Sequence, residues 1–506
     1  MDRKKNSVLN VSSNFLILLT NTFLSFAVRT VFIKILGEEY LGVNTLFTNI
    51  LQVLSLAELG ISTAINYALY KPLAHQDYKK ISAILKFFKK AYIVIGLIIL
   101  CIGILIIPFL GIMLKTNNVP HTTLIYLLFL INTASMYFIS YKETLITADQ
   151  KYYKLGKILF LSNCGIYISQ ILVLYITHNF ILYLLVQFII TLIQRILCNR
   201  TITKEYDDRI DFHCEEEISD NELNTIKDNI KAMFCHRVGY HVVQGSDNII
   251  ISAFINVATV GIYGNYLSLT SMVNTLLYTI FTSITSSFGN LAALENENTL
   301  ESVFDKLNFL AFIVFGFATL CFAILFVPFI RLWIGDSYVL PYKIILVICF
   351  NFYIYGIRAP IDTAKEAAGV YRQDRYAPII WSILNVFLSI VFVRMWGLIG
   401  VLLGTTISSL LVPCWNRPYI VYKYVFHSSS LKYFVDAIKK FIILLIIYFI
   451  VYFITKSIVF DNLLLDIFWR LFICTSIFAF FIVIIFRKNE NYKFYVDFIK
   501  NKVLRK

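Results

Sequence analysis

Apolar stretches long enough to cross a lipid bilayer recur along the whole of this 506-residue chain. A membrane-spanning helix requires about 20 consecutive apolar residues. We count about fourteen such stretches, which begin near residues 11, 41, 91, 122, 157, 180, 232, 261, 308, 340, 377, 397, 437 and 464. Because charged residues make up only 15% of the chain and its mean hydropathy is +0.72, we predict an all-α polytopic membrane protein.

Lysine and arginine are distributed unevenly between the loops that join these stretches. Roughly thirty-six of the 45 lie on one side of the predicted membrane, mainly at 71–90, 195–231, 358–375 and 417–440 and at the two ends of the chain. Basic residues concentrate on the cytoplasmic side, so both termini are expected in the cytoplasm. The net charge of +14 then reflects topology and contact with anionic lipids, and no nucleic-acid partner is expected. The lysine-rich segment 79–90 is predicted to be an amphipathic piece lying on the inner membrane surface.

The chain repeats itself at a nearly constant offset, which indicates an internal duplication. The hexapeptide AYIVIG at 91–96 returns as AFIVFG at 311–316. Pairs that share this offset to within one position are Gly42 and Gly261, Asn132 and Asn351, and Thr144 and Thr363. An even number of spans in each half gives a parallel repeat. We therefore predict a six-helix bundle at 1–200, a polar cytoplasmic linker at 201–231, a second six-helix bundle at 232–424, and two additional spans with a basic tail at 425–506.

Polar residues gather on one face of several predicted spans, beginning with HRVGYHVVQGSDN at 236–248. At helical spacing this face carries Arg237, His241, Gln244 and Asn248, with Tyr240 and Asp247 beside it. The first span of the first half has a similar stripe, formed by Asn14, Asn21, Ser25 and Arg29. The second spans add Asn44, Thr48, Gln52, Ser55 and Glu58 in one half and Asn265 in the other. These groups either hydrogen-bond between helices or line a hydrated cavity.

The ionisable members of these faces favour the cavity. An arginine or aspartate near the bilayer centre costs about 2.5–3.5 kcal/mol on insertion scales, so several in one bundle indicate a solute pathway. We expect Arg29 and Arg237 to line it. Helix depths place Glu58 near the level of Arg237 and Asp247 near that of Arg29, which predicts two counter-charge pairs that open and close during gating.

Two segments of the first half resemble a known family. RTVFIKILGEEYLGVNTLF at 29–47 and SLAELGISTAINYALYKPL at 55–73 are similar to the N-terminal signature of the oligosaccharide-lipid flippases used for O-antigen and capsular polysaccharide. EAAGVYRQDRYAPI at 366–379 and WGLIGVLLGTTISS at 396–409 resemble the corresponding parts of the second half. These flippases are the polysaccharide transporter branch of the multidrug/oligosaccharidyl-lipid/polysaccharide (MOP) superfamily, which has a MATE-like fold.

The resemblance implies two helical bundles facing each other across a cleft in a bacterial cytoplasmic membrane. It implies that an undecaprenyl-pyrophosphate-linked repeat unit passes from the inner to the outer leaflet through a cationic lumen, a role that Arg29 and Arg237 fit. Asn, Gln, His and Tyr side chains would then bind sugar hydroxyls and ring faces. It also implies coupling to a proton or sodium gradient, with the polysaccharide polymerase and chain-length machinery as possible partners.

Two other functions stay open from the sequence. A drug or metabolite antiporter of the same fold would bind cationic substrates through a mainly acidic cavity, whereas acids and bases are balanced here. An integral-membrane polymerase would require a cluster of acid and base groups, and the outer loops are short. No cofactor or metal site is expected. The nine cysteines form no CxxC pair, so neither disulfides nor structural zinc is expected.

Overall fold

The computed structural model describes residues 2–55, 65, 68–69, 72–73, 75–114, 119–149, 151–206, 210, 242–243, 245–285, 288–289, 291, 297–370 and 372–503. All regular secondary structure in these residues is helical. The chain divides into two compact units, Met1–Gly261 and Ile262–Lys506. Each is described by itself.

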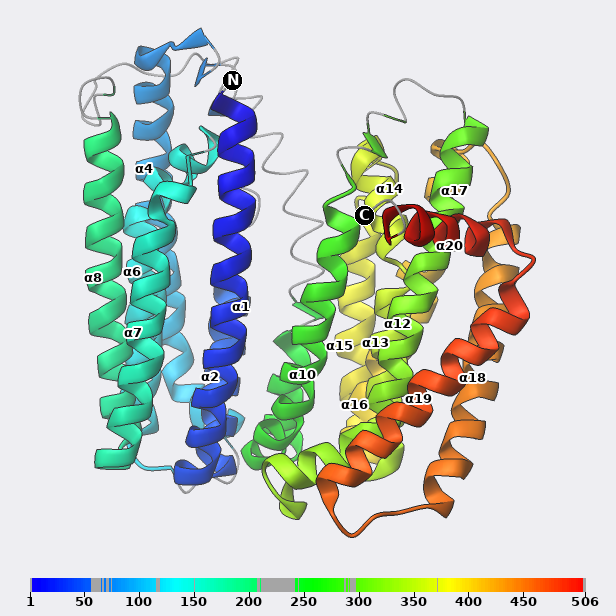
Figure 1. The fold of residues 1–506 in the computed structure, drawn as a ribbon. Helices are drawn as coiled ribbons and strands as arrows, with labels where there is room; N and C mark the ends of the chain where they lie inside the picture. Colours follow the sequence, from blue (N-terminus) through cyan, green and yellow to red (C-terminus); the bar gives the residue numbers. More distant parts are fainter. Residues whose placement is uncertain are drawn as a thin grey trace. The chain divides into compact units, whose positions relative to one another are not determined.

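The first unit is a bundle of long helices (Figure 1). Its elements are α1 (Asp2–Leu36), α2 (Glu38–Leu54), α4 (Tyr78–Ile106), η2 (Ile107–Phe109), α5 (Leu110–Met113), α6 (Thr122–Ala148), α7 (Tyr153–Thr177) and α8 (Phe180–Tyr206), followed by a helical segment at 245–254. Helix α1 packs on α7, α4 packs on α6, and α8 packs on both α6 and α7.

The second unit contains most of α10 (Val257–Thr282) and all later helices. These are α12 (Glu297–Trp333), η3 (Asp336–Tyr338), α13 (Tyr342–Gly356), α14 (Ala359–Ala368), η4 (Arg372–Asp374), α15 (Ala377–Trp396), α16 (Leu398–Leu411), α17 (Pro413–Tyr424), α18 (Leu431–Ser457), α19 (Leu463–Phe486) and α20 (Glu490–Val503). Helix α12 contacts α13, α18 and α19, and the short α20 lies crosswise to α18 and α19 (Figure 1).

The prediction of an all-α polytopic membrane protein is confirmed. Among the described residues, nine helices are long and apolar enough to span a bilayer, or ten if the bent α6 is counted as one span. The predicted linker at 201–231 lies mostly outside the described residues, so the predicted domain bounds stay a prediction. The described part of the segment at 245–261 belongs to the first unit.

Small residues let helices approach closely in the second unit. Gly397 has a φ of +61° and is the only residue between α15 and α16, which then pack along one another. A Cβ atom added to Gly404 would lie 2.6 Å from the Ser389 hydroxyl, and one added to Gly400 would lie 2.1 Å from the Phe392 carbonyl oxygen. The amide of Asn385 donates to Thr405 across the same interface at 3.0 Å. Glycine contacts and interhelical hydrogen bonds are the usual means of helix association in a membrane.

The lysine-rich segment 79–90 does not form the surface piece that was predicted. It is not a separate surface helix, because α4 continues without a break from Tyr78 to Ile106. The side chains of Ile81, Ile84 and Phe88 are buried in the first unit. The lysines therefore lie in the first turns of a spanning helix.

Candidate functional site

Arg29 is held between two helices of the first unit. It lies on α1, where it is half-buried, and it is close enough to the phenol of Tyr183 on α8 for the two to interact electrostatically. One turn further along α1, Phe32 packs edge-on against Phe180 and Tyr183, with ring centroids 5.3 Å apart in each case. Aromatic packing thus fixes the turn of α1 that carries the guanidinium.

Of the other residues in the α1 stripe, Asn21 joins two helices and Ser25 bonds within its own helix. The amide of Asn163 on α7 donates to the side-chain oxygen of Asn21 at 3.0 Å, which joins the two helices. The hydroxyl of Ser25 donates to the backbone oxygen of Thr22. The side chain of Asn14 lies outside the described residues. Interhelical hydrogen bonding, one of the two interpretations of this stripe, therefore holds for Asn21.

The polar face of α2 is turned away from the packed side of that helix. Leu46, Phe47 and Ile50 are buried, whereas Asn44 is half-buried and Thr48 and Gln52 are exposed. In a membrane bundle, an uncharged polar face that is not packed against its own bundle requires water or another polar surface beside it. This arrangement agrees with a hydrated surface along α2.

Asp247 and Asn248 occupy the helical segment at 245–254, and both are buried. The Oδ1 atom of Asn248, in a side chain only 2% exposed, has no hydrogen-bond partner among the described residues. A buried polar atom left unpaired costs about 1–3 kcal/mol, so a polar ligand or water would stabilise this position. Asn265 on α10 was predicted to belong to the polar face of the second span of the second half, and it is fully buried in the second unit.

Five predicted site residues, Arg237, Tyr240, His241, Gln244 and Glu58, lie outside the described residues. The predicted pairing of Glu58 with Arg237 is therefore not tested. The predicted pairing of Asp247 with Arg29 is not tested either. Both pairs stay predictions.

Glycine contacts bring the start of α10 against α2 within the first unit. A Cβ atom added to Gly42 would lie 1.9 Å from the Val257 carbonyl oxygen, and one added to Gly261 would lie 2.3 Å from the Glu38 carbonyl oxygen. The same added atom on Gly261 would lie 2.9 Å from the backbone nitrogen of Gly42. Two glycines that the repeat pairs therefore meet at one backbone crossing. The segment before α10 packs there too, because the hydroxyl of Ser252 donates to the Met113 carbonyl.

A cluster of charged and aromatic side chains in the second unit was not predicted from the sequence. Arg417 on α17 donates to Oδ1 of Asp362 on α14 at 2.7 Å, and Tyr278 on α10 donates to Oδ2 at 2.8 Å. The guanidinium of Arg358, only 3% exposed, lies 5.9 Å from the ring centroid of Trp381. Three helices thus converge on one carboxylate, with two arginines beside it.

A second buried ion pair lies close by in the sequence. The ammonium of Lys365 on α14 binds the carboxylate of Asp374 in η4, and both side chains are buried. This pair closes the turn inside EAAGVYRQDRYAPI, one of the segments that carry the family resemblance. Burying either charge alone would be costly, so the pair fixes the end of α14 against η4.

The first unit has a similar arrangement at the repeat-related position. Glu143 on α6 interacts electrostatically with Arg195 on α8. Arg195 donates to the backbone oxygen of Asn132 at 3.0 Å and to the hydroxyl of Ser135. Asp362 follows Glu143 by the same offset that relates Asn132 to Asn351. The repeat therefore contained the signal that would have identified both carboxylates.

These clusters can hold or exchange charge inside the bundle. The carboxylates of Glu143 and Asp362 are half-buried, so removing a partner arginine leaves a charge that is only partly compensated by solvent. An anionic ligand can compete for the guanidinium, which binds phosphate oxygens through paired hydrogen bonds. A proton can neutralise the released carboxylate.

No family model matches the chain, and no curated protein matches it. Solved structures do match. The lipid II flippase MurJ in an inward closed conformation is 18% identical over 95% of this chain and 99% of its own, with a TM-score of 0.67. An inward-facing multidrug resistance MATE transporter of the MOP superfamily is 14% identical over 80% of this chain and 96% of its own, with a TM-score of 0.63.

A third match is the Vibrio cholerae MATE transporter VcmN in its bent form. It is 13% identical over 84% of this chain and 98% of its own, with a TM-score of 0.55. The identities are low, so these matches establish the architecture. The chain has the helical membrane fold shared by MurJ and the MATE transporters.

Proposed function

We propose that this protein is a flippase for a lipid-linked oligosaccharide, with undecaprenyl pyrophosphate as the carrier lipid. It would move the repeat unit from the inner to the outer leaflet of a bacterial cytoplasmic membrane for O-antigen, capsular or exopolysaccharide synthesis. Both termini would lie in the cytoplasm. The polysaccharide polymerase and chain-length machinery would then act on the delivered unit as downstream partners.

The extent of the match to the lipid II flippase carries this proposal. That structure covers 95% of the chain, whereas the inward-facing MATE transporter covers 80%. The difference between these two covered fractions of the chain is close in length to the segment 425–506, which contains α18, α19 and α20. The likeness to a lipid flippase thus extends over nearly the whole chain.

The chemistry of the substrate assigns proposed roles to the predicted site residues. The polar, anionic head of a lipid-linked sugar diphosphate must cross the bilayer while its tail stays in lipid. Arg29 and Arg237 would bind the diphosphate, since a planar guanidinium forms paired bonds with phosphate. The proposed contacts to sugar hydroxyls and rings are Asn44, Asn248, Asn265, Gln244, His241 and Tyr240. Asp247 and Glu58 would act as counter-charges, and a proton or sodium gradient would drive the cycle.

Reconstitution tests the proposal directly. Labelled lipid-linked oligosaccharide would be incorporated into vesicles with the purified protein, and its arrival in the opposite leaflet would be measured with and without an imposed gradient. Arg29→Ala should reduce the rate at least tenfold, and Arg29→Lys should recover part of it because charge returns without the planar fork. Arg200→Ala is the matched control, since Arg200 is an exposed arginine of the same unit. Equal rates for Arg29→Ala and Arg200→Ala would exclude Arg29 from the pathway.

A multidrug or metabolite antiporter is the second candidate, and the likeness to two MATE transporters favours it. A single deletion strain distinguishes the flippase function from the antiporter function. A deletion strain with intact glycosyltransferases should accumulate lipid-linked repeat units if the protein is a flippase. Normal polysaccharide export together with impaired efflux of cationic dyes would support the antiporter instead.

A further inference from the structure

The C-terminal helix α20 begins where a membrane span ends. Helix α19 is long and apolar enough to cross the bilayer and ends at Phe486, and α20 starts four residues later at Glu490. In Figure 1, α20 lies crosswise to α18 and α19. A three-residue link cannot carry the chain far from the bilayer, so α20 starts at the height of the lipid headgroups.

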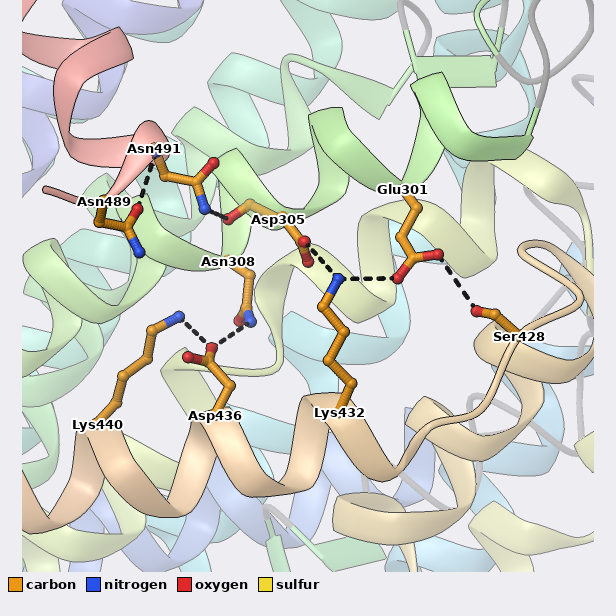
Figure 2. A network of polar contacts seen from close by, with 9 residues as sticks. All are labelled: Glu301, Asp305, Asn308, Ser428, Lys432, Asp436, Lys440, Asn489 and Asn491. Atoms are coloured by element: carbon orange, nitrogen blue, oxygen red, sulfur yellow. Dashed lines mark hydrogen bonds and ion pairs between the residues drawn. The ribbon is translucent and has the colours of Figure 1, made fainter.

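One face of α20 is fixed to α12. Asn491 donates to the backbone oxygen of Asp305 at 3.4 Å, as Figure 2 shows. The hydroxyl of Tyr495 donates to the backbone oxygen of Lys306 at 3.1 Å, and its ring stacks on Phe309 with centroids 6.4 Å apart. Burial raises the pKa of Tyr495 to about 12, so this donor stays protonated near neutral pH. The helix is therefore a docked element of the second unit.

Another face of α20 presents two phenylalanines outward. Phe494 is 44% exposed and Phe498 is 53% exposed, although both are large apolar side chains. They lie one helical turn apart with nearly parallel rings, 6.5 Å between centroids and 20° between planes. The ammonium of Lys306 lies 4.6 Å above the ring of Phe494. Aromatic rings beside lysines are typical of helices that lie in the membrane interface.

The charges around Phe494 and Phe498 favour contact with an anionic surface. Arg487, Lys488, Lys493 and Lys500 are exposed, against the two exposed acids Glu490 and Asp497. At helical spacing Lys500 lies about 160° around the helix from Phe498, so it projects from the opposite side of α20. A lipid leaflet with anionic headgroups offers both an apolar layer for the rings and negative charge for the lysines.

We propose that α20 lies in the headgroup region of the leaflet that α19 has just left. Phe494 and Phe498 insert among the acyl chains, and the basic residues at 487–500 contact anionic lipid headgroups. The partner is the lipid surface itself. This inference rests on the second unit alone and does not depend on which substrate the protein carries.

The polar network around α20 gives this contact a structural consequence. Lys432 on α18 bridges Glu301 and Asp305 on α12 at 3.3 and 3.1 Å, and Asp436 binds Lys440 at 2.6 Å (Figure 2). Helix α20 adds to this network through Asn491. Lipid binding to α20 would therefore also hold the beginnings of α12 and α18.

A tryptophan placed on each side of the helix tests the proposal. Phe498→Trp and Lys500→Trp would be made separately in the full chain and reconstituted with phospholipids brominated on their acyl chains. Quenching would be read as the difference from the parent, which has five tryptophans. Phe498→Trp should be quenched at least twofold more strongly than Lys500→Trp. Equal quenching of the two, or none, would overturn the insertion of this face.

The charge contribution is tested in the Phe498→Trp background. Replacing Arg487, Lys488, Lys493 and Lys500 together with glutamine should reduce the quenching in vesicles that contain phosphatidylglycerol. It should have little effect in pure phosphatidylcholine. Equal loss in both lipids would overturn the role of anionic headgroups. Crosslinking of two copies through position 498, with no quenching by brominated lipid, would identify a second protein molecule as the partner and overturn the proposal.

Discussion

Replacing Gly42 with alanine should destabilise the first unit, because the added methyl group has no space. The new Cβ atom would lie 1.9 Å from the Val257 carbonyl oxygen and 2.8 Å from the Val257 carbonyl carbon. Ordinary contacts begin near 3.4 Å, so α2 and the start of α10 would have to separate by roughly 1.5 Å. The obstructing atoms are backbone, and no side-chain rotation can relieve the clash. Overpacking of this kind costs about 1–3 kcal/mol.

A matched glycine separates this clash from the general effect of the substitution. Gly165 lies inside α7, and a Cβ atom added there would meet no atom within 4 Å. Because alanine favours helix more than glycine does, by about 1 kcal/mol, Gly165→Ala should leave stability unchanged or raise it. Gly42→Ala and Gly261→Ala should each lower it, and the double variant should lose less than the sum, since both methyl groups open the same crossing.

Thermal unfolding in detergent can follow these variants with a thiol-reactive fluorophore. In a background in which the other eight cysteines are replaced by alanine, Cys198, which is buried in the first unit, should react only when that unit opens. The transition of Gly42→Ala should fall by several degrees relative to Gly165→Ala. If the two variants unfold at the same temperature, the close backbone contact between α2 and the start of α10 does not exist in the membrane protein.

Two further variants test the charge clusters. Asp362→Asn should lower the free energy of unfolding by about 1.5–3 kcal/mol, because it leaves the half-buried Arg417 without its carboxylate. The Asp362→Asn, Arg417→Leu double variant should recover part of that loss, and an additive loss would show that the two residues do not interact. Burial lowers the pKa of Lys151, but its bonds to Asp149 and Glu205 outweigh burial and raise it overall. The stabilisation by this ion pair is therefore complete below the ordinary lysine pKa of about 10.4 and is lost as the pH rises through the raised value. The difference in melting temperature between the parent and Lys151→Met should shrink between pH 9 and pH 12, and a difference that stays constant would contradict the ion pair.

The spans and the repeat could be predicted from the sequence because both depend on patterns along the chain. Apolar length identifies a spanning helix without knowledge of its neighbours. The constant offset of the repeat pairs Gly42 with Gly261, although it gives no indication that the two backbones touch. Contact between repeat-related residues depends on how helices cross, which no local pattern encodes.

Which helix faces which could not be predicted. Spacing alone groups the α1 stripe, yet Asn21 bonds to Asn163 on α7 while Arg29 lies near Tyr183 on α8. The lysines at 79–90 suggest a surface location because composition does not distinguish a helix lying on a bilayer from one that extends beyond it. Glu143 and Asp362 fall close to the basic segments between predicted spans, where a carboxylate has the same sequence context as an ordinary solvated group.

The glycine crossing and the polar face of α2 together indicate how this unit could move during transport. Gly42 fixes the first turns of α2 by backbone contact, whereas Thr48 and Gln52, further along the helix, are exposed. From Gly42 to Leu54 the helix is about 18 Å long, so a rotation of about 10° at the crossing displaces its far end by about 3 Å. Two backbones in direct contact can turn against each other without repacking long side chains. A glycine crossing is therefore suited to act as a pivot for the polar face in the proposed flippase cycle, and an added methyl group should impair transport even under conditions where the protein remains folded.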